Sequence, residues 1–163
     1  MAVGAAVRSM SGTIEITLER PDSADAQTLI AELEAYLIPL SPPESRHGYS
    51  IDKLIREDVP FFIIRSNGTP AGCGGVKLFG TDYGEIKRMY VRPQFRGLGF
   101  AKLMLEHLAD YACSRGVSTL RLETGIAQRD AIALYERAGF QCIPPFGEYK
   151  LDPLSRFYEK RIA

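Results

Sequence analysis

The stretch QFRGLGFA, residues 94–101, follows a segment that predicts a strand and leads into a segment that predicts a long amphipathic helix. We expect Leu98 to open that helix. The first turn of a helix carries unpaired backbone N–H groups and a partial positive charge. Gly97 and Gly99 would let this backbone approach phosphate oxygens closely, and Arg96 adds a fixed positive charge. The stretch therefore favours a pyrophosphate site at a strand–loop–helix junction.

The glycine pair is by itself equally compatible with a helix start in a tight loop. Two other phosphate-binding motifs do not fit the stretch. A P-loop requires a Gly-Lys-Ser or Gly-Lys-Thr run, and the chain contains neither. The dinucleotide fingerprint GxGxxG requires a third glycine where this chain has Lys102. The flanking sequence is therefore needed to decide between a ligand site and a simple turn.

Hydrophobic periodicity outside the stretch predicts an alternation of strands and helices. Two-residue alternation and β-branched runs indicate strands, and apolar residues at helical spacing indicate helices. We expect strands at 13–20, 59–65, 70–79, 85–91, 118–123, 140–143 and 156–162. We expect helices from a cap at Asp22 or Ser23 to Pro39, and over 50–57, 98–115 and 130–138.

The order of these elements predicts a mixed sheet. Asn67-Gly68 favours a hairpin turn, so the strands before and after it are expected to be antiparallel. The strand–helix–strand unit that joins 85–91 to 118–123 requires two parallel strands. Glycines within 70–79 are expected to mark a bulge or a close backbone approach. We expect an α/β (α+β) fold with a mixed, mostly antiparallel central sheet and helices on both faces.

Composition bounds the class of protein. The chain has 163 residues, the size of one domain, and its 20 Lys plus Arg balance 20 Asp plus Glu. This neutrality argues against nucleic-acid binding, which usually shows a basic excess. No apolar run approaches the ~20 residues that cross a bilayer, so we expect no membrane partner and a cytoplasmic location. We expect a flexible tail at 1–12 and a single domain over 13–163.

The three cysteines are far apart and odd in number. Cys73, Cys113 and Cys142 show no CxxC spacing, so neither a zinc site nor a disulfide framework is indicated. We expect no metal.

Two blocks of sequence resemble the GCN5-related N-acetyltransferase (GNAT) family. MYVRPQFRGLGFA, residues 89–101, is similar to the family's central motif Q/R-x-x-G-x-G/A. ALYERAGF, residues 133–140, is similar to a later motif of the family. Their order and spacing also fit, and the resemblance covers roughly residues 13–163. It implies the GNAT, or acyl-CoA N-acyltransferase, fold with a splay between its two parallel strands.

The resemblance implies an N-acetyltransferase that uses acetyl-CoA as cosubstrate. Acetyl-CoA would lie in the splay, with its pyrophosphate on the glycine loop. The end of the preceding strand would contact the pantetheine and polarise the acetyl carbonyl, as an oxyanion-hole donor does. The residues implied for cosubstrate binding are Met89, Tyr90, Val91, Arg96, Gly97, Leu98, Gly99, Phe100, Ala101, Gln128 and Tyr135. Gln128 stands where many relatives have asparagine, so its pantetheine contact would survive or shift.

The resemblance also implies catalytic roles. Tyr135 matches the family's usual acid, which protonates the leaving thiolate; the alternative is an aromatic core residue. Glu85 stands where some relatives carry a catalytic glutamate base; the alternative is a carboxylate paired with Lys87 or Arg88. Glu123, at the end of the neighbouring parallel strand, would bind a cationic amine or relay a proton through water.

Side-chain alternation along the strand at 85–91 predicts two faces. One face would carry Glu85, Lys87, Met89 and Val91, and the other would carry Ile86, Arg88 and Tyr90.

The acceptor side is less well defined. The loop at 41–49 falls where the family forms one wall of the acceptor pocket, so Tyr49 and His47 are candidate substrate-binding residues, and Glu44 would also be near. The segment at 144–153 also falls near the acceptor side. Its aromatic residues would shape the pocket, form a dimer contact, or only pack against one another.

Four functions remain in competition. The first is acetylation of a primary amine on a small molecule, by direct attack in a ternary complex. The second is acetylation of a protein or peptide, which would need an open groove. The third is a non-catalytic acyl-CoA-binding module, and the hydroxyl of Tyr135 argues against it. The fourth, nucleic-acid binding through Arg88, Arg92 and Arg96, conflicts with the neutral charge. A homodimer is plausible because the family often forms one.

Overall fold

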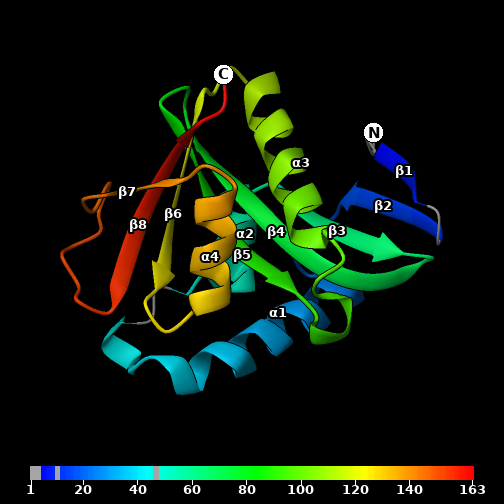
Figure 1. The fold of residues 1–163 in the computed structure, drawn as a ribbon, viewed down its shortest axis with the longest axis horizontal. Helices are drawn as coiled ribbons and strands as arrows, with labels where there is room; N and C mark the ends of the chain where they lie inside the picture. Colours follow the sequence, from blue (N-terminus) through cyan, green and yellow to red (C-terminus); the bar gives the residue numbers. More distant parts are fainter. Residues whose placement is uncertain (1–4, 10–11, 46–47) are drawn as a thin grey trace.

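The sheet defines the architecture. A computed structural model describes residues 5–9, 12–45 and 48–163 of the chain. Its described strands form one sheet of eight strands in the order β1-β2-β3-β4-β5-β6-β8-β7 (Figure 1). They are β1 (Ala5–Ser9), β2 (Gly12–Leu18), β3 (Phe61–Ser66), β4 (Thr69–Phe79), β5 (Tyr83–Val91), β6 (Thr119–Gly125), β7 (Gln141–Ile143) and β8 (Ser155–Arg161). Only β5 with β6 pairs in parallel among these, so the expected mixed, mostly antiparallel sheet is confirmed.

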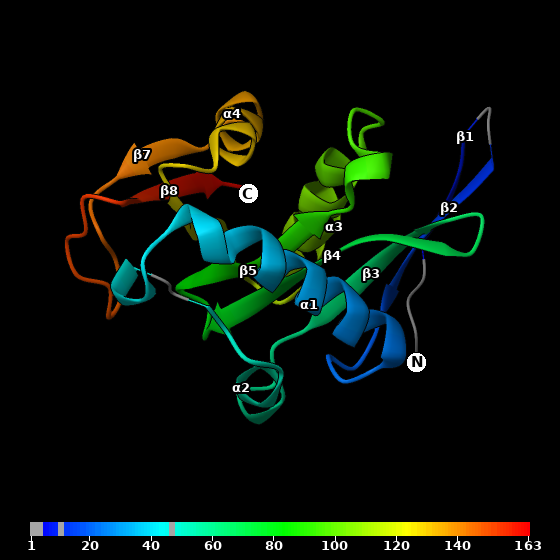
Figure 2. The same ribbon diagram turned by 90° about the horizontal axis from the view of Figure 1, so that it is seen from below.

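Helices cover both faces of the sheet (Figures 1 and 2). The helices are α1 (Ala24–Leu37), α2 (Ile51–Arg56), α3 (Phe100–Ser114) and α4 (Arg129–Arg137), with short 3-10 turns η1 (Ile38–Leu40), η2 (Pro43–Ser45) and η3 (Pro93–Phe95). Met104 and Leu108 of α3 are fully buried in the core that α3 and α4 form with one face. Leu29 of α1 and Leu54 of α2 are fully buried in a second core on the other face. No helix among the described residues is long and apolar enough to cross a bilayer.

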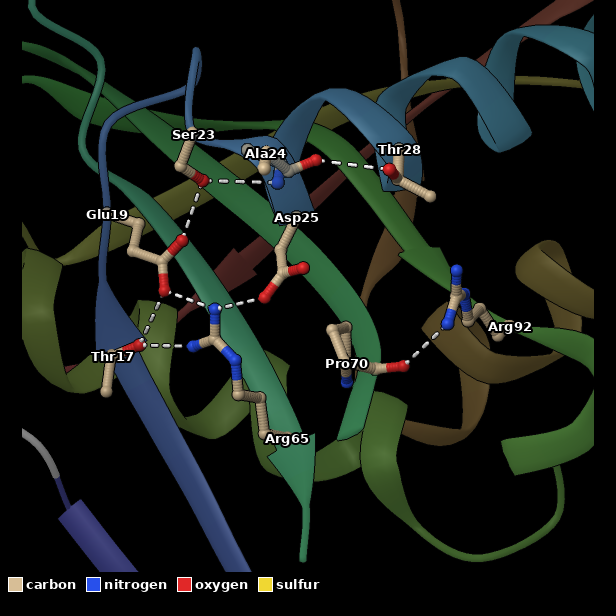
Figure 3. Close-up of polar contacts among 10 residues, drawn as sticks. Thr17, Glu19, Ser23, Ala24, Asp25, Thr28, Arg65, Pro70 and Arg92 are labelled. Carbon is tan, nitrogen blue, oxygen red and sulfur yellow. Dashed lines mark hydrogen bonds and ion pairs between the residues drawn. The ribbon is translucent and has the colours of Figure 1, made fainter. Parts of the chain in front are cut away.

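A polar cluster fixes the first helix to the first strands (Figure 3). The Arg65 guanidinium of β3 donates to Thr17 of β2 at 3.0 Å and to Asp25 of α1 at 2.9 Å, and it pairs with Glu19. Ser23 caps α1 by accepting from the Ala26 amide, as its position in the sequence predicts. The cluster therefore sets where α1 crosses the sheet.

The two parallel strands separate after a short contact. β5 and β6 pair only at Gly84 with Leu120 and at Glu85 with Arg121. The remainder of β5 continues beside β4, and β6 continues beside β8. A splay therefore opens between β5 and β6 towards the carboxyl ends of both strands. This is the opening that the family resemblance implies.

A bulge interrupts the alternation of β5. Cys73 pairs with Tyr90 and Gly75 pairs with Lys87, so three steps along β5 oppose two along β4. The extra residue is Arg88, whose φ is 55°. A Cβ at Gly72 would lie 2.4 Å from the Tyr90 carbonyl oxygen, so this close approach requires glycine. The glycines of β4 therefore mark a bulge, as expected.

The bulge makes the predicted faces of β5 wrong. Lys87 lies over the Tyr49 ring, and Arg88 donates to the Tyr49 carbonyl, so both face the side of α1 and α2. Met89 and Val91 pack instead into the core on the α3 side. A regular strand would have placed Lys87 and Met89 on one face, and the extra residue reverses the pattern between them.

The N-terminal residues differ from the expected flexible tail. Residues Ala5–Ser9 form β1, which pairs with β2 from Ala5 opposite Ile16 to Ser9 opposite Gly12. The physical reason is the free edge of β2, whose backbone N–H and C=O groups can pair with another extended segment. The other residues of the expected tail lie outside the described part of the chain, apart from Gly12.

Candidate active site

A long cleft enters the splay between β5 and β6. Its volume is about 930 Å³. The cleft is lined by the end of β5, the glycine loop, α3 and α4, and by two residues of α1, Leu33 and Tyr36. All cosubstrate residues that the resemblance implied line it except Leu98; these are Met89, Tyr90, Val91, Arg96, Gly97, Gly99, Phe100, Ala101, Gln128 and Tyr135.

The glycine loop ends in a helix that begins later than expected. α3 starts at Phe100 rather than at Leu98, because Gly97 and Gly99 have φ of 76° and 85°, outside the right-handed helical region. A Cβ at either glycine would meet no atom within 4 Å. Leu98 between them is 64% exposed and does not line the cleft. The loop thus offers open backbone at the N-terminus of a 15-residue helix.

Two side chains of the predicted cosubstrate site have other contacts. Arg96 donates from Nε to the Val91 carbonyl at 3.2 Å, and its guanidinium lies 5.4 Å from the centre of the Tyr36 ring. Tyr90 is buried against α1 and donates to Glu32 at 3.2 Å. Arg96 therefore remains at the cleft as a cation, whereas Tyr90 can offer the cleft little besides its backbone.

A second, smaller cavity of about 120 Å³ lies on the α1 side of the splay. Its walls come from α1, from the loop before α2, from β5 and β6, and from Tyr149. The described charged residues in these walls are Glu34, Glu85, Lys87, Arg88 and Glu123. Both signs of charge therefore face this cavity.

The two cavities share a wall. Leu33, Met89, Gln128 and Tyr135 line both of them. Tyr135 belongs to α4 and is 6% exposed. Burial, and then the nearby Glu123 carboxylate, raise the pKa of Tyr135, so its hydroxyl stays protonated at neutral pH. A buried proton donor thus stands at the junction of the cavities.

Glu85 is held in a buried triad. Its Oε2 lies 2.6 Å from Lys87 Nζ and accepts from the Tyr149 hydroxyl at 2.6 Å. Lys87 Nζ in turn donates to the Tyr149 oxygen at 3.0 Å. The side chains of Glu85 and Lys87 are 4% and 9% exposed. Burial, and then Glu85, raise the pKa of Tyr149 above its ordinary value. The pairing with Lys87 was the alternative interpretation of Glu85, and the geometry agrees with it.

The other acceptor-side residues form a mixed wall. Arg88 donates to the Tyr49 carbonyl at 2.8 Å and pairs with Glu34 of α1. Burial lowers the pKa of Arg88 to about 10, which leaves it charged at neutral pH. Tyr49 is buried, and its hydroxyl accepts from Lys77 at 3.2 Å. Glu123 accepts from the Ser155 hydroxyl at 2.7 Å. Tyr49 and Glu123 therefore both line the cavity that sequence reasoning assigned to the acceptor.

Some predicted residues fall elsewhere. His47 lies outside the described residues. Glu44 is exposed and does not line the smaller cavity. Phe146 packs on Tyr83 and Phe157, whereas Tyr149 reaches Glu85, so the segment at 144–153 serves both packing and the pocket. No group of His, Cys, Asp or Glu suited to a metal was found within the described ranges.

Sequence reasoning missed several contributors to the cavities, among them Leu33, Glu34 and Thr124. Leu33 and Glu34 belong to α1, whose crossing of the splay follows from tertiary contacts. Thr124 of β6 lines the smaller cavity from a buried position. The signal available in the sequence was that alternation places the Thr124 hydroxyl on the same face of the strand as the apolar Leu120 and Leu122.

Comparison with known proteins agrees with this geometry. A family model described as "Acetyltransferase (GNAT) family" matches residues 26–140. The IAA acetyltransferase of Azospirillum brasilense is 42% identical over 150 residues, which cover 91% of this chain and 98% of that protein.

Two solved structures share the fold. A Klebsiella pneumoniae protein described as an acyl-CoA N-acyltransferase has a TM-score of 0.75 at 39% identity, covering 91% of this chain and 97% of that one. A GNAT family acetyltransferase from Elizabethkingia anophelis with acetyl-CoA bound has a TM-score of 0.67 at 17% identity, covering 91% and 97%. The second is a likeness of fold alone. On the family model and the Azospirillum relative, the chain belongs to the GNAT family of N-acetyltransferases and is an acyltransferase enzyme.

Proposed function

We propose that this enzyme transfers an acetyl group from acetyl-CoA to a primary amine of a small molecule, by direct attack in a ternary complex. The observation that carries the proposal is the meeting of two cavities at Met89, Gln128 and Tyr135. One cavity leads to the glycine loop, and the other is lined by polar and charged side chains among others. Two substrates that enter from opposite sides would therefore meet beside a buried hydroxyl.

The larger cleft fits an acyl-CoA. The left-handed backbone at Gly97 and Gly99 leaves amide groups open to the cleft at the start of α3, where a helix favours a phosphate. Arg96 adds a positive charge beside them. Past Glu85, the edge of β5 that faces the splay has no ladder partner on β6, so its amides are available to an extended pantetheine-like arm. When bound, acetyl-CoA supplies a thioester that is activated for attack by an amine.

The smaller cavity favours a small acceptor. Ligand pockets for drug-sized molecules usually span about 300–1,000 Å³. The value of about 120 Å³ here is well below that range. Ser41, Ser45, Tyr49 and Tyr149 are among the residues that line the cavity. A peptide acceptor would need a long groove, and the small volume of this cavity favours a small acceptor instead.

The proposed chemistry assigns one task to each group. The amine nitrogen forms a bond to the acetyl carbon, the carbon–sulfur bond breaks, and its electron pair leaves on sulfur. Tyr135 donates its proton to that sulfur. A base takes the extra proton of the nitrogen, and we assign this role to Glu85 or to a water chain that includes Glu123. Because Glu85 is already paired with Lys87, it would act most directly by accepting a proton relayed through Tyr149.

The experiment is a titration followed by an activity panel. Purified protein is titrated calorimetrically with acetyl-CoA and with CoA, and micromolar binding of both is expected. Thiol release from acetyl-CoA is then measured with L-alanine, putrescine, glucosamine, IAA and a tripeptide with a free N-terminus. Inclusion of IAA follows from the name of the Azospirillum relative. Failure of the wild type to bind either nucleotide would refute the proposal, and preference for the tripeptide would favour a peptide acceptor.

A further inference from the structure

The Thr124 hydroxyl is a buried polar group without a partner. Thr124 belongs to β6 and is 3% exposed. Its Oγ1 is the one buried side-chain nitrogen or oxygen that finds no hydrogen-bond partner among the residues described. The residue lines the smaller cavity and not the larger cleft.

Packing does not explain this hydroxyl. Buried polar groups in folded proteins almost always have a hydrogen-bond partner, because desolvation without one is unfavourable. Thr124 lies on the same face of β6 as Leu120 and Leu122, which are each 1% exposed. Valine has the same shape as threonine and would fill this position without desolvating a hydroxyl. The hydroxyl is therefore explained by a partner that the folded chain does not itself supply.

The other residues that line the cavity indicate which molecule supplies the missing hydrogen bond. Glu85, Glu123 and Tyr135, the groups proposed to handle the protons of the reaction, line the same smaller cavity as Thr124. The cosubstrate cleft does not reach Thr124. We infer that the Thr124 hydroxyl accepts a hydrogen bond from the acceptor amine and thereby orients it for attack. This inference rests on the proposed function.

The geometry of attack by an amine explains why the pocket needs hydrogen-bond acceptors on its wall. A neutral primary amine has two N–H donors and one lone pair. The lone pair must point at the thioester carbon, so the two N–H groups must point away from it. Acceptors on the pocket wall hold them there, and the oriented approach is itself a large part of catalysis. Thr124 and Glu123 both line the smaller cavity, as neighbours on β6. A primary amine that donates one N–H group to Thr124 Oγ1 keeps its second N–H group for another acceptor of the cavity.

The test compares three variants with the wild type. T124V removes the hydroxyl and keeps the shape, and T124S keeps the hydroxyl. T119V makes the same chemical change on the same strand, outside both cavities. For each, kcat and KM are measured for acetyl-CoA and for whichever of L-alanine, putrescine or glucosamine releases thiol fastest with the wild type. Thermal midpoints are measured on the same samples.

The inference predicts that T124V lowers activity towards the amine without lowering the stability of the fold. T124V should lower kcat/KM for the amine by up to about tenfold, since a lost hydrogen bond is worth up to about that factor. Its KM for acetyl-CoA should change less than about twofold. Its melting temperature should equal or exceed that of the wild type, because an unpaired buried hydroxyl has been removed. T124S should recover kcat/KM to within about threefold, and T119V should match the wild type.

Three results would overturn the inference, and one of them would also overturn the proposed function. Unchanged kcat/KM for the amine in T124V would show that the hydroxyl does not bind the acceptor. A lower melting temperature with equal losses for both substrates would show a structural role. If the wild type itself releases no thiol with any amine, the proposed function fails and the inference fails with it. If the wild type turns over the amine and T124V does so equally well, the inference fails and the proposed function stands.

Discussion

The glycines of the loop after β5 are the residues whose conformation is most directly tied to the proposed binding of acetyl-CoA. Gly99 has a φ of 85° and lines the large cleft. Replacement by valine adds side-chain atoms to the cleft and strains the backbone by about 1–2 kcal/mol. We predict that Gly99→Val weakens calorimetric binding of CoA at least tenfold, because bulky atoms would then stand where the phosphates are proposed to bind.

Gly68 provides a matched control for the strain. Its φ is 82°, a Cβ there also meets no atom within 4 Å, and it lies in the turn between β3 and β4, away from both cavities. Gly68→Val should lose a similar amount of stability and bind CoA as the wild type does. Equal loss of affinity in both variants would show that strain, rather than the site, causes the effect.

Substitution of Tyr135 distinguishes a role in catalysis from a role in CoA binding alone. Its hydroxyl lies at the junction of the two cavities, and burial keeps it protonated. We predict that Tyr135→Phe lowers kcat by about 10²-fold or more, which is the usual range for general acid catalysis. The affinity for CoA measured by calorimetry should stay within about twofold, because the ring still packs on Phe140 at 5.7 Å. An unchanged kcat would remove Tyr135 from the mechanism.

At the scale of elements, an ion pair fixes α1 beside the end of β5. Arg92 pairs with Glu32 of α1 at 2.6 Å and donates a second bond to it at 3.0 Å. Hydrogen bonding to Arg92 lowers the pKa of Glu32 from its ordinary value of 4.5. A lowered folded-state pKa means that this pair stabilises the fold above about pH 4.5, and that the contribution is lost as the pH falls through the folded pKa.

This pair predicts a pH-dependent difference in stability. Glu32→Gln should lower the melting temperature at pH 7, and the gap from the wild type should close as the pH falls below about 4.5. Because Glu32 is 34% exposed, salt should also narrow the gap. Melting curves at several pH values and two salt concentrations would measure both effects. A gap that stays constant from pH 7 to pH 3 would contradict the assignment.

The elements themselves follow largely from the sequence, and the interruption of β5 does not. Periodicity predicts the types of β2 to β8 and of α1 to α4, because each buries one face or stripe. The glycines of β4 predict a bulge, but its location at Arg88 depends on pairing between strands. The Cys73 thiol donates to the Arg88 carbonyl at 3.3 Å, which is a tertiary contact. The faces of Lys87 and Met89 follow from the position of the bulge, and local alternation therefore misassigned them.

The candidate site shows the same division. The glycine loop and Tyr135 are local motifs and could be assigned from sequence. Leu33 and Glu34 line the smaller cavity because α1 crosses the sheet beside it, where its apolar face packs in the second core and ion pairs of Arg65 and Arg92 hold it. Contributions of this kind need the three-dimensional arrangement. The homodimer stays a prediction from the family resemblance.

At the scale of the whole molecule, the sheet has two parts joined by a short seam. β1 to β5 form one part and β6, β8 and β7 form the other, and the seam is the pairing of Gly84 and Glu85 with Leu120 and Arg121. Beyond the seam the cleft separates the parts, and its walls come from both, with α1 and α3 on one side and α4 on the other. A ligand that fills the cleft would therefore tie the two parts together.

This arrangement predicts a large stabilisation by acetyl-CoA. A ligand at 100 times its Kd stabilises the folded state by about 2.7 kcal/mol. For a chain of this size that free energy raises the melting temperature by roughly 5–11 °C. Hydrogen exchange should slow on both sides of the cleft, in residues 89–91 of β5 and in α4. The Gly99→Val variant, weakened at least tenfold, should gain at most about 1.4 kcal/mol at the same concentration, with a correspondingly smaller rise in melting temperature and weaker protection. An equal shift in that variant would place acetyl-CoA elsewhere, and protection of one side alone would mean that the ligand does not bridge the splay.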